Sequence, residues 1–234
     1  MYDKEKFYDN KFYGDSVNKR HIKALNELKQ VNKTFNNILD VGCGAGYPLS
    51  YIKKNLNIKD AFGLDISNDT LKEINTLGIK GFQVDLDNDP FPFEDNYFDL
   101  IISVEVIEHL NNPDLYLNEI YRVLKSSGVF VITTPNLGWW INILGLLLGY
   151  QPNYTDTSLN TSLGHFNGKF EPHGHLRNYS INGLSELLKL HQFKLLKKFG
   201  IQNIGITNYI EFIDNQISNH FPRFSCHIGL ILTK

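Results

Sequence analysis

Cysteine is scarce in this 234-residue sequence, which has only Cys43 and Cys226, far apart along the chain. A disulfide framework needs more cysteines than this, so we expect a reducing compartment, the cytoplasm. Residues 1–6 are polar and charged, and no apolar core of a signal peptide follows them. No apolar stretch approaches the roughly 20 residues of a membrane span. These absences predict a soluble protein that is neither secreted nor embedded in a membrane.

No charge of one sign dominates either. The chain has 23 Lys and Arg against 25 Asp and Glu, a formal net charge of −2. A nucleic-acid-binding protein usually carries a basic surface, so we expect no nucleic-acid partner. Repeats and low-complexity linkers are also lacking, and 42% hydrophobic residues is ordinary for a globular protein. Length and composition together predict one sizeable α/β domain with room for a small insertion.

Short apolar runs alternate with segments of helical period, a pattern typical of βαβ units and a mostly parallel sheet. Helices are expected at residues 16–29, 48–54, 68–77, 113–124 and 182–190. Strands are expected at residues 37–41, 61–64, 81–84, 98–103, 129–133, 193–199 and 225–232, with a turn at 126–128. The predicted fold is α/β, with a seven-stranded, mostly parallel sheet whose last strand is antiparallel and with helices on both faces.

The alternation stops between the fifth strand and the helix at 182–190, which indicates an insertion. We therefore predict a single domain, residues 1–234, in four segments. They are an N-terminal helical segment (1–35), a ligand-binding core (36–135), a substrate-side insertion (136–180) and the end of the sheet (181–234).

Three glycines at alternate positions, Gly42, Gly44 and Gly46, directly follow the first expected strand and open a helix. Glycine there allows a tight turn and close approach of the backbone to a ligand. A dinucleotide-binding loop has its third glycine one residue later and receives a pyrophosphate at the helix N-terminus. Here Asp40 precedes the loop, and its carboxylate would repel a pyrophosphate but suits a ligand carrying an ammonium group. A simple strand-to-helix turn is the alternative interpretation.

Two more acids end the next two strands. Asp65 ends the second strand, where a carboxylate can accept hydrogen bonds from both ribose hydroxyls. Asp85 ends the third, where it could accept one from an adenine amino group. A single Asp in such a place is usually a helix N-cap, but three acids at successive strand ends indicate a nucleoside-bearing ligand.

These residues resemble motifs of the class I S-adenosylmethionine-dependent methyltransferases, of the type 11 and type 23 groups. The resemblance is carried by residues 38–46, 63–67, 84–87, 90–99, 103–110 and 121–128. It is close over about residues 36–135 and implies a Rossmann-like fold, S-adenosylmethionine as cofactor and S-adenosylhomocysteine as product. The cofactor-binding residues it implies are Asp40, Gly42, Cys43, Gly44, Gly46, Asp65, Ile66, Asp85, Leu86 and Ser103.

Methyl transfer to a hydroxyl also needs a group that removes the hydroxyl proton, commonly a histidine or a carboxylate. His109 follows the fourth strand, next to the expected cofactor, and is one candidate. Glu105, Glu108 and His109 are spaced i, i+3, i+4, so a helix would place them on one face, where they could hold a divalent metal. The segment resembles that of quinol O-methyltransferases, for which a metal role has been proposed. Local structural hydrogen bonds are the alternative, and we expect no bound metal.

A second group of candidates lies inside the insertion. His173, His175 and Arg177 alternate, so an extended segment would point them to one side. His175 is our second candidate for the catalytic base, and a loop held by hydrogen bonds is the alternative. Zinc is not expected, because no cysteine and no regularly spaced acid accompanies these histidines.

Two aromatic-rich segments remain open to several interpretations. Residues 137–150 contain both tryptophans and almost no polar side chain, and they could form a lid over an apolar acceptor, a homodimer surface or a helix packed on the sheet. Tyr8, Phe12 and Tyr13 could close over the cofactor or staple the first helix.

The function expected from the sequence is O-methylation of a small-molecule, sugar, lipid-linked or carrier-linked hydroxyl. Methylation of a nitrogen or of a quinol is the alternative within enzymes. A cofactor-binding pseudoenzyme that acts as a protein partner is the alternative of another class.

Overall fold

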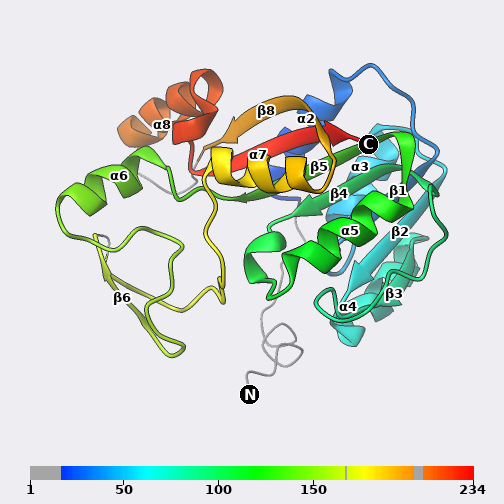
Figure 1. The fold of residues 1–234 in the computed structure, drawn as a ribbon, viewed down its shortest axis with the longest axis horizontal. Helices are drawn as coiled ribbons and strands as arrows, with labels where there is room; N and C mark the ends of the chain where they lie inside the picture. The colour runs from blue at the N-terminus through cyan, green and yellow to red at the C-terminus, as the bar shows by residue number, and fades with distance from the viewer. Residues whose placement is uncertain (1–16, 167, 203–207) are drawn as a thin grey trace.

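Seven strands form the central sheet of the computed structural model, which describes residues 17–166, 168–202 and 208–234 (Figure 1). The strand order is β3-β2-β1-β4-β5-β9-β8. The strands are β1 (Asn37–Val41), β2 (Asp60–Asp65), β3 (Lys80–Gln83), β4 (Phe98–Val104), β5 (Leu124–Pro135), β8 (Lys194–Ile201) and β9 (His227–Thr233). Strands β1 to β5 pair in parallel, and β9 is antiparallel to both β5 and β8. The predicted sheet, with its antiparallel last strand, is confirmed.

The strand order reverses beside β1. Strand β2 pairs with one edge of β1, and β4 pairs with the other. In doubly wound sheets, ligands bind at such a reversal, outside the carboxyl ends of the strands. The loop after β1 therefore opens at the edge of the sheet where a ligand is expected.

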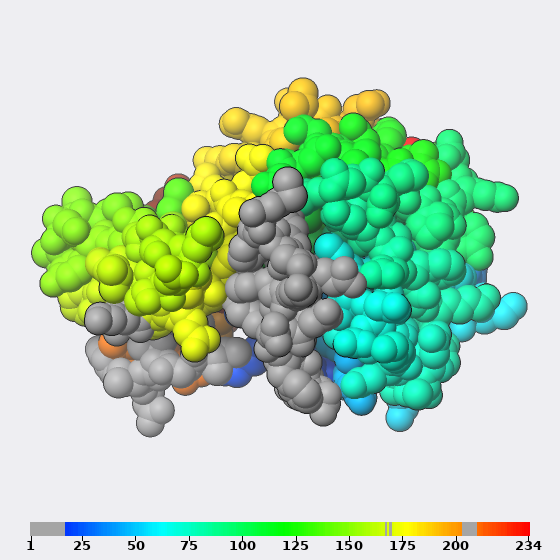
Figure 2. Space-filling view, turned by 90° about the horizontal axis from the view of Figure 1, so that it is seen from below, coloured from blue at the N-terminus to red at the C-terminus, as the bar shows by residue number. Residues whose placement is uncertain are grey.

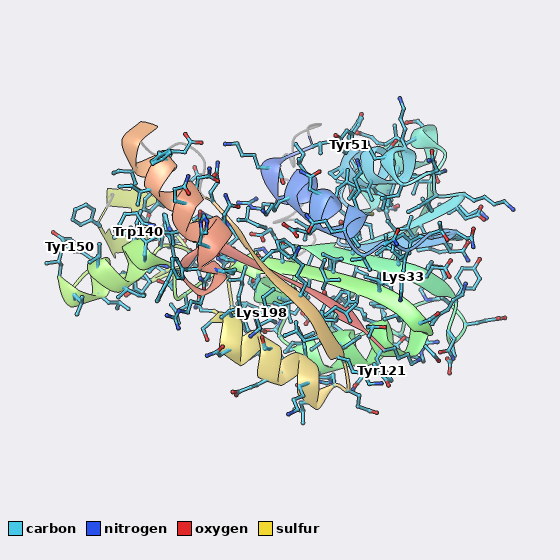
Figure 3. The ribbon with its side chains drawn as sticks, turned by 90° about the horizontal axis from the view of Figure 1, so that it is seen from above. Lys33, Tyr51, Tyr121, Trp140, Tyr150 and Lys198 are labelled. Atoms are coloured by element: carbon cyan, nitrogen blue, oxygen red, sulfur yellow. The ribbon has the colours of Figure 1, made fainter. Side chains whose placement is uncertain are left out.

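Helices cover both faces of the sheet. In Figure 3, the labelled residues Tyr51 and Tyr121 mark helices that lie on opposite sides of it. The helices are α2 (Lys19–Lys29), α3 (Tyr47–Asn55), α4 (Asn68–Ile74), α5 (Pro113–Val123), α6 (Trp140–Leu147), α7 (Ile181–Leu190) and α8 (Asn208–His220). Short 3₁₀ turns lie at Asn75–Leu77, Ile107–His109 and Pro222–Phe224. Side chains of α2, α3 and α4 pack in one apolar core with Ile38, whereas those of α5 and α7 pack in the other with Leu39. Neighbouring residues of β1 thus serve opposite faces, as the pleat of a strand requires.

The insertion after β5 forms a lobe beside the core, coloured from green to yellow in Figures 1 and 2. It contains α6 and a two-stranded hairpin of β6 (Ser162–His165) and β7 (Gly168–Phe170). Asp214 of α8 joins the lobe to the end of the sheet, because its Oδ1 accepts hydrogen bonds from the indoles of Trp139 at 2.7 Å and Trp140 at 2.8 Å. Residues 137–150 therefore include a helix that is anchored at its N-terminal end.

The far side of α6 carries exposed leucines. Leu147 is 77% exposed and Leu148, just after the helix, is 67% exposed, while Trp139 is 2% exposed. The helix thus packs through one face and leaves an apolar surface on the other. No helix in the described ranges is long and apolar enough to cross a membrane.

Three elements differ from the predictions. The expected turn at 126–128 is part of β5, whose pairing shifts from Phe98↔Leu124 to Leu100↔Val129, so that the residues between form a bulge. The helix expected from residue 16 begins at Lys19, because the side chain of Asn18 caps it by accepting hydrogen bonds from the backbone N–H groups of Arg20 and His21. Helix α8 was not predicted at all.

Candidate active site

A cavity of about 280 Å³ opens at the carboxyl ends of β1, β2 and β4. It is lined by the glycine loop, by the ends of β2 and β3, by the segment after β4 and by the start of α2. Eight of the ten predicted cofactor residues line it: Gly42, Cys43, Gly44, Gly46, Asp65, Ile66, Asp85 and Leu86. Asp87, Thr70 and Tyr47 are further lining residues. The cavity therefore lies where the sequence motifs placed a nucleoside-bearing ligand.

The glycine loop needs glycine for two separate reasons. All three glycines have positive φ, which is +79° at Gly42 and +82° at Gly46, a region that side chains with a Cβ rarely adopt. A Cβ on Gly42 would also lie 2.4 Å from Cγ2 of Val106, in the segment after β4. The loop is thus folded tightly onto its neighbours, and its backbone faces the cavity.

Asp65 connects the loop to the end of β2. Its Oδ2 accepts a hydrogen bond from the backbone N–H of Gly44 at 2.8 Å, and its Oδ1 accepts one from that of Ser67 at 2.9 Å. Ser67 in turn caps α4 through its hydroxyl. A carboxylate oxygen can accept more than one hydrogen bond, so Asp65 can hold the loop and still accept from a ligand hydroxyl.

Asp85 has a similar local structure after β3. Its Oδ1 accepts from the backbone N–H of Asp87 at 3.0 Å, and its Oδ2 accepts from the side chain of Asn88 at 2.8 Å. Asp87 is 7% exposed and accepts from the backbone N–H of Asn112, the N-cap of α5, at 2.8 Å. The acidic loop after β3 is therefore fixed to α5 beside the cavity.

Asp40 and Ser103 are not among the residues that line the cavity. Asp40 is 3% exposed within β1, and burial, helped by the negative charge of Asp65, raises the pKa of its carboxyl to about 8. The hydroxyl of Ser103 donates to the backbone carbonyl of Val41 at 3.1 Å and so ties β4 to the end of β1. Ser103 therefore holds the base of the glycine loop, whereas Asp40 is buried in β1 just before that loop.

The expected helix through Glu105, Glu108 and His109 does not form. Glu105 has φ +60°, and only Ile107–His109 make a 3₁₀ turn, so the three side chains do not share a helix face. Oε2 of Glu105 lies 3.5 Å from Nε of Arg20 and 3.2 Å from Nε2 of His227, and its Oε1 accepts from Thr133. The helix face on which a metal site at Glu105, Glu108 and His109 would have depended is therefore absent, and Glu105 belongs to a different cluster from His109.

Glu108 is almost completely buried, at 1% exposure. Its Oε2 accepts a hydrogen bond from the hydroxyl of Thr134 at 2.9 Å, while its Oε1 has no hydrogen-bond partner among the described residues. Burial, together with the charge of Glu105, raises the pKa of this carboxyl well above its usual range.

The two predicted catalytic histidines come together from distant parts of the chain. His109 lines the cavity, and its ring lies 4.8 Å from that of His175, between centroids, at an interplanar angle of 62°. The backbone carbonyl of Glu108 accepts hydrogen bonds from the N–H groups of Leu176 at 2.8 Å and Arg177 at 3.0 Å. The insertion is thereby fixed against the segment that follows β4.

Asp156 shapes the turn that carries His175. Its carboxylate accepts from the backbone N–H groups of His173, Gly174 and His175, at 3.0, 2.7 and 3.1 Å. Burial alone would raise the pKa of Asp156, but these three backbone hydrogen bonds together, with the charge of His173, outweigh it and lower the pKa. The ring of His173 stacks on that of His175 at 5.2 Å.

Arg177 does not extend the row of histidines toward a ligand. Its guanidinium donates instead to the backbone carbonyls of Leu110 and Asn111. Asp156 holds the turn from one side and Arg177 joins it to the segment after the 3₁₀ turn Ile107–His109, so this arginine has a structural role.

Sequence reasoning did not select Arg20 and His21, which line the cavity from the start of α2. Burial, followed by the positive charge of Arg20, lowers the pKa of His21 to about 4, so this ring is neutral near pH 7. The only feature of the sequence that could have indicated these two residues is their position directly after Asn18, which caps α2. Tyr8, Phe12 and Tyr13, expected near the cofactor, lie outside the described residues.

Comparison with known proteins decides the family. A family model described as a methyltransferase domain matches residues 13–198. The chain belongs to this family, the class I S-adenosylmethionine-dependent methyltransferases. The human arginine-hydroxylase NDUFAF5, mitochondrial, is 34% identical over 109 residues, which are 47% of this chain and 31% of that protein. A fatty-acid O-methyltransferase of Mycolicibacterium smegmatis is 30% identical over 124 residues, 51% of this chain and 44% of that protein.

The chain therefore spans less than half the length of these curated relatives. A solved structure from Thermotoga maritima, described as a possible histamine N-methyltransferase, superimposes with a TM-score of 0.63 over 98% of this chain and 95% of that one. The two share 16% sequence identity, so this likeness concerns the fold alone.

S-adenosylmethionine fits the residues of the cavity. The backbone of Gly42–Gly46 can approach the cofactor closely, Asp65 can accept from its ribose hydroxyls and the loop at Asp85 can receive its adenine. When bound, the cofactor supplies a methyl group already activated on a positively charged sulfur. The protein then has to place an acceptor, exclude water and, for a hydroxyl acceptor, remove a proton.

Proposed function

We propose that this chain methylates a hydroxyl of a small or carrier-linked acceptor, which binds where the insertion meets the cofactor cavity at His109 and His175. One observation carries the proposal. His109 lines the cofactor cavity, and its ring also contacts a histidine from the insertion. A group that handles a proton must lie within reach of the reacting atom, and this pair is placed between the two parts of the site.

The reaction balances with groups that the chain provides. The acceptor oxygen attacks the methyl carbon, the carbon–sulfur bond breaks, and its electron pair stays on sulfur, giving S-adenosylhomocysteine. The hydroxyl proton leaves through His109 and His175. We assign the cofactor to the glycine loop with Asp65, Ile66, Asp85 and Leu86, and we assign Asp40 and Ser103 to support of that loop.

The exposed leucines of α6 support an acceptor with an apolar part. Leu144, Leu147 and Leu148 are more than half exposed on the same lobe that carries His175. The ring of Trp139, just before α6, lies 6.5 Å from that of Tyr154, and the Tyr154 ring lies 6.2 Å from that of His175. The likeness to a fatty-acid O-methyltransferase supports the same substrate class. A second copy of the chain is the alternative occupant of this surface.

The direct test uses S-adenosylmethionine labelled with ¹³C in its methyl group and a panel of hydroxyl, amine and quinol acceptors, with and without acyl chains. Formation of S-adenosylhomocysteine with a new O–CH₃ carbon resonance supports the proposal. An N–CH₃ resonance would replace it with N-methylation. Tight cofactor binding without turnover on any acceptor would favour a pseudoenzyme.

Two variants refine the test. His175→Ala is expected to reduce turnover at least about 100-fold, as for loss of general acid–base catalysis, with nearly unchanged cofactor affinity. Leu147→Ser is expected to raise KM for acyl-bearing acceptors only. If Leu147→Ser instead dissociates a dimer in sedimentation experiments and leaves KM unchanged, the surface joins two chains.

A further inference from the structure

Three side chains converge at the junction of the insertion and the core. Ligand atoms of Glu108, His109 and His175 all lie within 4.8 Å of one another. Glu108 and His109 come from the 3₁₀ turn after β4, whereas His175 comes from the turn held by Asp156 in the insertion. Glu105, spaced for this role in the sequence, is not a member.

The hydrogen bonds of the two histidines define which ring nitrogen carries the proton. Nδ1 of His109 lies 3.1 Å from the backbone carbonyl of Gly174, and Nδ1 of His175 lies 2.8 Å from that of Tyr154. A carbonyl oxygen can only accept, so both Nδ1 atoms are the donors. In each neutral ring the lone pair is therefore on Nε2. Metal-binding histidines are commonly oriented in this way, with the other ring nitrogen donating to a carbonyl.

Glu108 supplies a second, independent observation. Its side chain is 1% exposed, and Oε1 accepts no hydrogen bond from any residue in the described part of the chain. A buried carboxylate oxygen without a partner is costly, and pairing with a cation is one of the few ways to offset that cost. The other oxygen, Oε2, is held by Thr134, which fixes the orientation of the carboxylate.

We infer that Glu108, His109 and His175 bind one divalent transition-metal ion, through a carboxylate oxygen and the Nε2 atoms of both histidines. Two imidazoles and one carboxylate suit zinc, iron or a similar ion, whereas magnesium and calcium prefer oxygen ligands alone. Three protein ligands leave a position open for a substrate, as in catalytic zinc sites. This proposal differs from the expectation from the sequence, which was that no metal is bound.

The separations are compatible with one ion after at most a small closing movement. Metal–ligand bonds of about 2.1 Å place tetrahedral ligands about 3.4 Å apart, so atoms that lie within 4.8 Å of one another have to approach by no more than about 1.4 Å. The Asp156 turn and the backbone bonds from Leu176 and Arg177 to Glu108 keep His175 near the other two ligands before the ion arrives.

This role deepens the proposed function and rests on it. An acceptor hydroxyl bound at the open position would lose its proton more readily, because a metal ion lowers the pKa of a bound hydroxyl. That proton would pass to solvent water, and the oxygen would then attack the methyl carbon. With the ion bound, the two histidines would hold it in place of acting as the base, which is their role in the metal-free form of the proposal. The insertion would thus complete the catalytic centre of the core.

The experiment measures metal binding directly, on the full chain freed of metal with a chelator. We expect titration with Co²⁺ to give one bound ion per chain and a visible absorption band of a nitrogen–oxygen site. His175→Ala and Glu108→Gln should each weaken Co²⁺ binding by more than about 100-fold, since loss of an outer hydrogen-bond partner alone costs about 10- to 100-fold. Gln keeps an oxygen for the Thr134 hydroxyl, so this variant preserves the local fold.

Two histidine variants serve as controls. His173→Ala removes the ring stacked on His175, and His220→Ala removes an exposed ring on α8; both should bind Co²⁺ like the wild type. Unchanged affinity for S-adenosylmethionine in all variants shows that each is folded. The inference is overturned if Co²⁺ and Zn²⁺ do not bind stoichiometrically, or if binding survives both His175→Ala and Glu108→Gln.

Failure of the metal site and failure of the methyl transfer give different results. If elemental analysis shows that the protein contains no metal and the protein still methylates an acceptor, the ion has no role in catalysis. The histidines then act as the base. Stoichiometric metal binding without O-methylation of any acceptor would keep the site and reject the proposed function.

Discussion

The backbone N–H of Gly44 donates a hydrogen bond of 2.8 Å to Oδ2 of Asp65, which joins the glycine loop after β1 to the acidic end of β2. One carboxylate therefore shapes the loop and faces the cavity that the loop lines. Removing this carboxylate therefore removes both the support of the loop and the acceptor that faces the ligand.

Asp65→Ala is expected to weaken binding of S-adenosylmethionine and of S-adenosylhomocysteine by about 10- to 100-fold. Hydrogen bonds to charged groups contribute about 1.5–3 kcal/mol each, and the ribose is common to both ligands. Calorimetric titration measures the two affinities. Asp69→Ala is the control, because Asp69 is exposed and forms an ion pair with Lys72 in the first turn of α4. Unchanged affinity in Asp65→Ala would contradict the cofactor assignment.

Most of this cavity could be predicted from the sequence, because its residues are close to strand ends and their spacing is local. Strand alternation places the carboxyl ends of β1 and β2 at one edge, so Gly42 and Asp65 had to meet there. The same logic could not give Asp156 or Arg20. Their positions depend on how the insertion and α2 pack, which no short-range pattern encodes.

The segment after β4 shows why spacing alone misleads. An i, i+3, i+4 pattern describes a helix face only if the backbone is helical throughout, and the positive φ of Glu105 interrupts it. His175 then joins Glu108 and His109 through bonds between backbone groups far apart in sequence. Helix α8 was not predicted, although Ile210, Ile213 and Ile217 recur at helical spacing in its sequence. The role of its buried Asp214 is visible only in the structure, where the carboxylate accepts hydrogen bonds from the indoles of two tryptophans.

Gly42 and Gly78 form a matched pair for testing the loop. Both have positive φ, +79° and +68°, but a Cβ on Gly42 would lie 2.4 Å from Val106, whereas one on Gly78 meets nothing within 4 Å. Gly78→Ala should cost about 1–2 kcal/mol of stability from left-handed backbone strain. Gly42→Ala should cost about 1–3 kcal/mol more from overpacking and should also weaken cofactor binding. Chemical denaturation measures the stability of the two variants, and calorimetry measures their affinity for the cofactor. If both variants lose the same stability, Val106 can move aside without a free-energy cost.

Asp40 is expected to lose its proton when S-adenosylmethionine binds. With a pKa of about 8, its carboxyl is mainly protonated near pH 7 in the free protein. The positive sulfur and ammonium of the cofactor favour the carboxylate and lower that pKa. Calorimetric titration in two buffers of different ionisation enthalpy should therefore show proton release. The release should be smaller with S-adenosylhomocysteine, which lacks the sulfonium charge, and absent in Asp40→Asn. Identical heats in both buffers for the wild type would contradict the prediction.

The loop before β4 is held by a partly buried ion pair, away from the cavity. Arg122 donates to Glu119 from Nε at 2.9 Å and from a terminal nitrogen at 2.7 Å, and it also donates to the backbone carbonyls of Phe91 and Phe93. Glu119 accepts in addition from the backbone N–H of Phe91 at 2.7 Å. The hydrogen bonds from Arg122 are the main cause of a lowered pKa at Glu119, which burial opposes.

Glu119→Gln is expected to destabilise the protein by about 1–3 kcal/mol near pH 7, because the amide replaces a charged acceptor of two strong hydrogen bonds.

The sign of the pH dependence follows from the lowered pKa. In the unfolded chain a glutamate titrates near about 4.3, and in the folded protein Glu119 titrates lower, so its contribution is fully present above the unfolded value. That contribution is lost as the pH falls through the folded pKa. Urea unfolding across the acidic range should thus show the wild type and Glu119→Gln converging at low pH. The exposed Glu186→Gln serves as the control and should follow the wild type throughout. A stability difference that persists undiminished in acid would mean that Glu119 acts through packing and not through its charge.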